Sequence, residues 1–224
     1  KDIFLEWDAM EGRLPSQTAL DRVVAAFNDA PAKNPPGNAD GVNLHVEAGG
    51  DVIPLANWHD LDANDWPREF DRTKVGAFGE PAERAGTNWP NVRAAKALVY
   101  HYAVFANDVF KGFAAGELGD GLGGNDLYVG RCQKCPGGET DDDRAAALMH
   151  ELGHNLGLGH GGADGEGRAD DDNRKPNYHS IMNYLWQNHE PWMDEGGRTI
   201  KNGDGDKDDV AWSLTYSERA FPDL

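Results

Sequence analysis

The chain has 224 residues and a formal net charge of -18, from 39 acidic and 21 basic side chains. This length is enough to bury a sizeable core within one large domain. The acidic balance argues against nucleic-acid binding, and no run approaches the roughly 20 apolar residues of a membrane span. We therefore treat residues 1–224 as one domain, and expect a monomer without nucleic-acid or membrane partners.

The first half of the chain predicts alternating strands and helices. Asp2–Trp7 is rich in β-forming residues and predicts a strand. Ser16 is a candidate N-cap for a helix over Gln17–Ala30, where apolar residues recur at helical spacing. The alternating run Val42–Val46 predicts a half-buried strand, whereas residues 48–93 show little periodicity and predict a long loop.

The next apolar run allows two interpretations. It predicts either a short helical turn followed by a strand over Leu98–Phe105, or one helix over Val92–Phe110, because periodicity alone does not separate short apolar runs. Asn125–Val129 then predicts a short strand. Aspartates 141–143 supply an N-cap and negative charge for a largely buried helix over Arg144–Leu156.

The most informative stretch begins inside this helix and reads His-Glu-Leu-Gly-His-Asn-Leu-Gly-Leu-Gly-His. His150 and His154 are four residues apart, so their imidazoles lie on one helix face and can reach one cation. Gly157 can adopt positive φ, which ends the helix and lets His160 approach the same ion. Three neutral imidazoles leave a tetrahedral zinc ion one open position, which is the catalytic arrangement.

Glu151 follows the first of these histidines. A carboxylate in this place is the natural base for a zinc-bound water. An ordinary amphipathic helix with surface histidines is the alternative interpretation. A glycine and a third histidine at fixed offsets argue against it.

Two cysteines, Cys132 and Cys135, form a C-x-x-C pair. One such pair cannot supply four thiolates to a zinc ion, and a redox role would need a βαβ context. We interpret the pair as a small loop disulfide in an exported protein, with a reduced, inert pair as the alternative.

Acidic runs make calcium a candidate second metal. Asn202–Asp209 places oxygen atoms at alternate positions, with Asp204, Asp206 and Asp208 as candidate ligands. A solvated acidic loop is the competing interpretation. The acidic stretch Asp164–Asn173 is another candidate.

Downstream, residues 180–184 read Ser-Ile-Met-Asn-Tyr. Together with the histidine motif, this resembles the metzincin clan of zinc endopeptidases, in which a methionine-containing turn lies beneath three histidines. Met182 matches that methionine, and Tyr184 stands where astacins and serralysins have a tyrosine that ligates zinc and can swing to stabilise the oxyanion. The phrase also resembles secreted bacterial snapalysin- and pappalysin-like enzymes, although snapalysins have aspartate where this chain has His160. Animal matrix metalloproteases lack the tyrosine.

The resemblance implies an α+β fold: a twisted, mostly parallel five-stranded sheet with a backing helix and an active-site helix. A small irregular C-terminal lobe would follow, so the lobes would span about 1–157 and 158–224. It also implies a secreted zinc endopeptidase acting on proteins or peptides, with any signal and pro-segment outside this sequence.

In such an enzyme an extended substrate would bind antiparallel to an edge strand, here near Asn125, Leu127 and Val129. The rival from another class is a non-catalytic extracellular zinc- and calcium-binding module. The intact Glu151 argues against the rival, because a structural zinc site needs no base.

Overall fold

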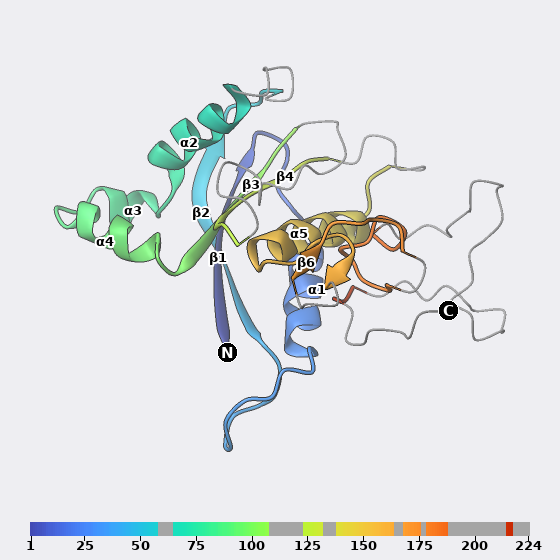
Figure 1. Cartoon of the computed structure of the whole chain (residues 1–224). Coiled ribbons are helices and arrows are strands. Elements are labelled where there is room, and N and C mark those ends of the chain that lie inside the picture. The colour runs from blue at the N-terminus through green and yellow to red at the C-terminus, as the bar shows by residue number, and fades with distance from the viewer. Residues whose placement is uncertain are drawn as a thin grey trace.

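The computed structural model describes residues 1–57, 65–107, 123–131, 138–163, 168–175, 178–187 and 214–216. These residues form a central sheet between two layers of helices (Figure 1). In chain order the elements are β1 (Asp2–Met10), α1 (Gln17–Asn28), β2 (Asn43–Ile53), α2 (Asp65–Ala77), α3 (Pro81–Arg84), α4 (Trp89–Lys96), β3 (Tyr100–Phe105), β4 (Asp126–Val129), α5 (Asp141–Asn155), β5 (Gly162–Ala163) and β6 (Ala169–Asp170).

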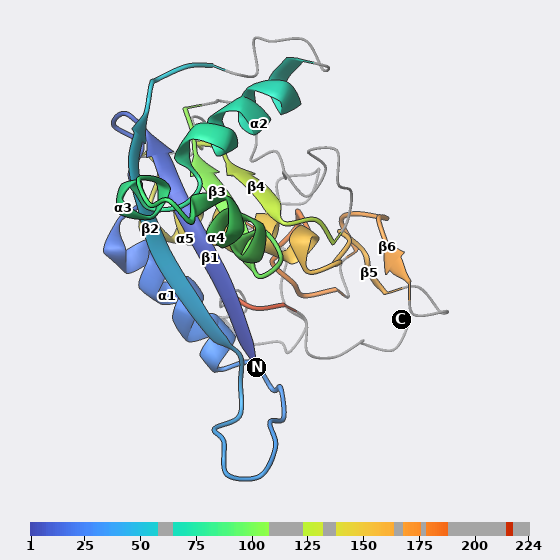
Figure 2. The ribbon, with the colours of Figure 1, turned by 90° about the vertical axis from the view of Figure 1, so that its left-hand side faces the viewer.

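The main sheet has the order β2-β1-β3-β4, and every neighbouring pair is parallel. Parallel neighbours require crossover connections, which α1 supplies between β1 and β2, and α2 to α4 supply between β2 and β3. Figures 1 and 2 show α1 and α5 on one face and α2 to α4 on the other. Covering both faces is what a parallel sheet needs.

The architecture is therefore a mixed one, with a parallel sheet and covering helices, and it is compatible with the expected α+β class. Four strands of the main sheet lie within the described residues, and β5 and β6 form a separate antiparallel pair. Among the helices described, none is long and apolar enough to cross a membrane.

The N-terminal elements follow the sequence predictions, with longer strands. Ser16 caps α1, because its Oγ accepts a hydrogen bond from the Ala19 backbone N at 3.0 Å. The first strand continues to Met10 and the second to Ile53, beyond the apolar runs that predicted them.

The expectation of a long loop over residues 48–93 is wrong. Three helices, α2 to α4, occupy most of its second half. Neither α3 nor α4 buries a single residue, so neither carries the apolar stripe by which a sequence reveals a helix. The helix–strand interpretation of the following run is confirmed, since α4 ends at Lys96 and β3 begins at Tyr100. The single-helix alternative is wrong.

Strand β1 carries two buried carboxylates, Glu6 and Asp8, each only 1% exposed. Glu6 accepts a hydrogen bond from the Gly79 backbone N and pairs with Lys96 Nζ at 2.6 Å. Asp8 accepts hydrogen bonds from Tyr102 Oη at 2.9 Å and from the Asp51 backbone N at 2.8 Å. Burial raises the pKa of Asp8 to about 6, although both hydrogen bonds act to lower it.

Candidate metal centre

Helix α5 starts with a reciprocal cap. Thr140 Oγ1 accepts a hydrogen bond from the Asp143 backbone N at 3.2 Å, and Asp143 Oδ2 accepts one from the Thr140 backbone N at 2.9 Å. The helix therefore begins at Asp141, three residues before the predicted Arg144. The predicted aspartate cap is wrong in detail, because the three aspartates occupy the first turn. Their charge is favourable there, next to the positive end of the helix dipole.

The other end of α5 is closed by a left-handed glycine. Gly157 has φ 86°, the helix ends at Asn155, and two hydrogen bonds reverse the chain. Leu158 N donates to Gly153 O and Gly157 N donates to His154 O, both at 2.9 Å. This is the Schellman arrangement, and it directs the chain back toward the helix face that carries His154.

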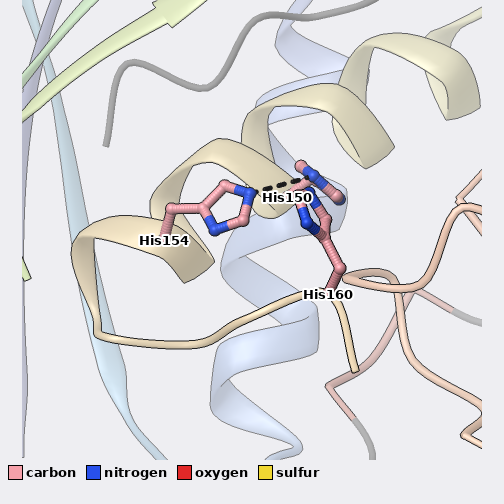
Figure 3. A group of neighbouring side chains, drawn as sticks. All are labelled: His150, His154 and His160. Atoms are coloured by element: carbon pink, nitrogen blue, oxygen red, sulfur yellow. Dashed lines mark hydrogen bonds between the residues drawn. The ribbon is translucent and has the colours of Figure 1, made fainter. Parts of the chain in front are cut away.

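His150, His154 and His160 meet at this reversal, the first two from α5 and the third from the loop that follows it (Figure 3). One ligand atom from each of the three lies within 4.8 Å of the other two, the one such group of metal-binding side chains among the described residues. The Nε2 atoms of His150 and His154 are 3.2 Å apart. The three side chains can therefore hold one metal ion.

The Nδ1 atom of each ring, here called its outer nitrogen, lies within hydrogen-bond distance of an acceptor oxygen. Nδ1 of His150 lies 2.8 Å from Ile181 O, and Nδ1 of His154 lies 2.9 Å from Leu158 O. Nδ1 of His160 lies 2.5 Å from Asp171 Oδ1. Because carbonyl and carboxylate oxygens only accept, the three contacts place the ring protons on Nδ1. All three Nε2 lone pairs then face one another, which is the tautomer that metal ligation requires.

Burial keeps two of these rings neutral. Burial first, and then the neighbouring imidazoles, lower the pKa of His150 to about 3 and that of His154 to about 4. A metal ion at neutral pH therefore displaces no proton from either ring.

The local chemistry fits a zinc ion. Nε2 of His160 is buried and has no hydrogen-bond partner among the described residues, a costly arrangement for a polar atom. Tetrahedral nitrogen ligands at the usual Zn–N distance of about 2.0–2.1 Å stand about 3.3 Å apart, close to the 3.2 Å between His150 and His154. A cation among the three nitrogens would satisfy the orphaned atom and remove the repulsion between facing lone pairs.

Glu151 is completely buried and follows His150 on α5. Burying a carboxylate is costly unless it is paired, hydrogen-bonded or coordinated to a metal ion. The backbone position of Glu151 is therefore next to that of the first candidate ligand, and its side chain is out of bulk water.

Met182, here named the methionine floor, packs against α5. Met182 is fully buried, and a Cβ added at Gly153 would lie 2.3 Å from its sulfur, so helix and methionine touch where the glycine stands. The turn holding Met182 is hydrogen-bonded to a distant segment through Ile181 N and Thr215 O at 2.9 Å. Tyr216 Oη in that segment donates to Met149 O at 2.6 Å, which ties the floor to the helix.

Tyr184 lies against the histidines. Its ring centroid is 5.5 Å from that of His150 and 4.6 Å from that of His160, and the side chain is 39% exposed. One edge of the histidine cluster is therefore lined by a phenol that solvent can reach.

The predicted substrate strand is β4, the last strand of the described sheet. Leu127 and Val129 are buried side chains of the core. The carbonyls of Asn125 and Val129 accept hydrogen bonds from Tyr102 N and Ala106 N, so they point toward β3. Substrate binding by Asn125, Leu127 and Val129 stays a prediction. In the structure the carbonyls of Asn125 and Val129 are hydrogen-bonded to the β3 side, and the side chains of Leu127 and Val129 are packed in the core.

Other predicted site residues lie outside the described residues. These are Cys132, Cys135 and the candidate calcium ligands Asp204, Asp206 and Asp208. Within the other acidic stretch, Asp170 pairs with Lys175 and Asp171 contacts His160.

The sequence interpretation missed two contributors to the site, Asp171 and Tyr216. Asp171 stands inside an acidic run whose members look alike in sequence, and Tyr216 lies 67 residues from the carbonyl it contacts. No local pattern could have singled out either residue.

No protein-family model, curated protein or solved structure matches the chain.

Proposed function

We propose that the chain is a zinc-dependent endopeptidase of the metzincin type. The observation that carries the proposal is the convergence of three Nε2 atoms whose rings are protonated on the opposite nitrogen, beside the buried Glu151. Imidazoles are ligands that suit zinc and other first-row transition metals, and three protein ligands are the number that catalytic zinc sites use. A purely structural site would have a fourth protein ligand and no use for a base.

A zinc ion held by His150, His154 and His160 would act as a Lewis acid that polarises the scissile carbonyl and lowers the pKa of water to about 7. Glu151 accepts a proton from the attacking water and donates it to the amine nitrogen as the C–N bond breaks. Its burial supports this role, because a water-excluded carboxylate exchanges its proton with the reacting atoms and not with solvent.

Tyr184 would stabilise the oxyanion that develops on the carbonyl. Its ring packs beside two of the histidines while part of the side chain stays exposed. A hydroxyl there donates a hydrogen bond that strengthens as negative charge grows, and such an interaction accelerates the reaction more than it tightens substrate binding.

An extended peptide beside β4 would run past the histidines. Gly123, just before β4, donates a backbone hydrogen bond to His154 O at 3.0 Å, so this end of the strand meets the end of the active-site helix. A substrate bound along the strand has chain on both sides of the scissile bond, which favours internal cleavage over removal of terminal residues.

Cleavage of a peptide library tests the proposal. Peptides blocked at both termini are expected to be cut internally, zinc chelation to stop cleavage, and added zinc to restore it. Zinc binding without hydrolysis of any peptide would favour the non-catalytic binding module. Cleavage confined to free N-termini would replace the endopeptidase with an aminopeptidase.

A further inference from the structure

The three candidate ligands differ in what holds their outer nitrogen. His150 and His154 point Nδ1 at main-chain carbonyls of Ile181 and Leu158. His160 is held by a side chain, the carboxylate of Asp171, at 2.5 Å. This contact brings a carboxylate to the one candidate ligand that stands outside the helix.

Residues 170–173, here named the positioning loop, are anchored on the side of His160. Gly161 N donates to Asp170 O at 2.7 Å, next to the short pairing of β5 with β6. The Asp170 carboxylate accepts from Asp172 N at 2.9 Å and forms an ion pair with Lys175. Asp171 is thus presented from a braced segment, although its own side chain is largely exposed.

The same loop is anchored on the side of Tyr184. Asn173 Oδ1 accepts hydrogen bonds from Tyr184 N at 2.9 Å and from Arg174 N at 2.7 Å. Arg174 has φ 62°, the one positive φ among the described non-glycine residues. Asn183 Nδ2 donates to Lys175 O at 2.6 Å and draws the loop toward the methionine turn. A left-handed non-glycine residue is unfavourable, so these contacts hold the loop in a conformation it would not adopt alone.

We infer that Asp171 and Asn173 are positioning residues of the metal centre, an inference that rests on the metal binding in the proposed function. Asp171 fixes the ring and tautomer of His160, and Asn173 fixes the loop that presents Asp171 by tying it to Tyr184. Partners of this kind act on metal affinity through the ligand they orient. Neither residue belongs to the group of three candidate metal ligands.

The test measures zinc affinity of the full chain by competition with a chromophoric chelator. Asp171→Ala is expected to weaken zinc binding about 10- to 100-fold, and Asp171→Asn, which keeps an acceptor but loses the charge, by an intermediate factor. Asp172→Asn is the matched control, because it removes a neighbouring charge of the same sign whose carboxylate does not contact His160. It should bind zinc within about twofold of the wild type.

A double-mutant cycle tests the role of Asn173. Asn173→Ala alone should weaken zinc binding several-fold, but adding it to Asp171→Ala should change affinity by less than about twofold, since the loop then presents nothing to His160. Thermal unfolding of each metal-free variant separates this effect from loss of folding, and Asp171→Asn keeps the side-chain shape if Asp171→Ala unfolds.

Wild-type protein that binds no zinc would overturn both the proposed function and this inference. Wild-type protein that binds zinc, with Asp171→Ala binding equally well or Asp172→Asn weakened equally, would overturn the inference alone. If the losses of zinc affinity in the double-mutant cycle are additive, Asn173 is not a positioning residue, and the inference holds for Asp171 alone.

Discussion

Replacing Gly153 with alanine tests the contact between α5 and the methionine floor. The added Cβ would stand 2.3 Å from Met182 Sδ and 2.9 Å from Tyr216 Cε1. Carbon–sulfur contacts need at least about 3.5 Å, so the methionine must retreat by more than about 1 Å. Its sulfur lies toward the end of a flexible side chain, but Met182 is fully buried, so that side chain can retreat only by pressing on its neighbours, among them the turn that carries it. That turn includes Ile181, whose carbonyl holds the His150 ring at 2.8 Å.

Overpacking of this kind costs about 1–3 kcal/mol, and the better helix propensity of alanine returns up to about 1 kcal/mol. We therefore expect Gly153→Ala to lower the free energy of unfolding by up to about 3 kcal/mol and to weaken zinc binding through the displaced turn. Urea denaturation of the metal-free protein and a chelator competition measure the two effects.

Gly76→Ala is the matched control. Gly76 is also a helical glycine, near the end of α2, and an added Cβ meets nothing within 4 Å. It should stabilise the protein by up to about 1 kcal/mol and leave zinc affinity unchanged. A Gly153→Ala protein as stable as the wild type, with unchanged zinc affinity, would refute the packing described for Met182.

Three further predictions concern pH and the helix end. Because the folded pKa of Asp8 is about 6, above its usual value of 3.8, the free energy of unfolding should fall as pH rises from about 4 to 6. Asp8→Asn should abolish this fall in urea titrations and stabilise the protein above pH 7 by up to about 3 kcal/mol. Because His150 and His154 have pKa values of about 3 and 4, the zinc association constant should fall by at most about one decade per pH unit between pH 6 and 5. A steeper fall, toward the three decades that three ordinary histidines would give, contradicts their burial. Gly157→Ala places a side chain at φ 86° and should cost about 1–2 kcal/mol in urea denaturation; an unchanged midpoint would contradict the left-handed turn.

The local part of the site could be predicted from the sequence. Helical spacing alone places His150 and His154 on one face, and a glycine three residues after His154 predicts the reversal that brings in His160. These relations depend on a few consecutive residues, so no knowledge of the tertiary fold is needed. The strand Tyr100–Phe105 was one of two interpretations, because a run whose last four residues are all buried suits a strand or a buried helix, and only the structure decided between them.

The features that were missed depend on contacts between distant segments. Glu6 and Asp8 lie in a run that predicts an ordinary strand, yet they are buried against partners 73 and 94 residues away. Helices α3 and α4 bury no residue, so periodicity gives no signal for them. Asp171 is one of three consecutive aspartates, and it meets His160 through contacts made in the folded chain, among them the pairing of β5 with β6.

The central claim is that Glu151 serves as the base beside three zinc-binding histidines. The most direct measurement compares wild type and Glu151→Gln, both loaded with one zinc ion, in the cleavage of an internally quenched peptide blocked at both ends. The proposed mechanism predicts equal zinc affinity and a loss of kcat of at least about 100-fold in Glu151→Gln, the range expected for a general base. Equal cleavage by the two proteins would contradict the role assigned to Glu151, and absence of cleavage by zinc-loaded wild type would contradict the proposed function.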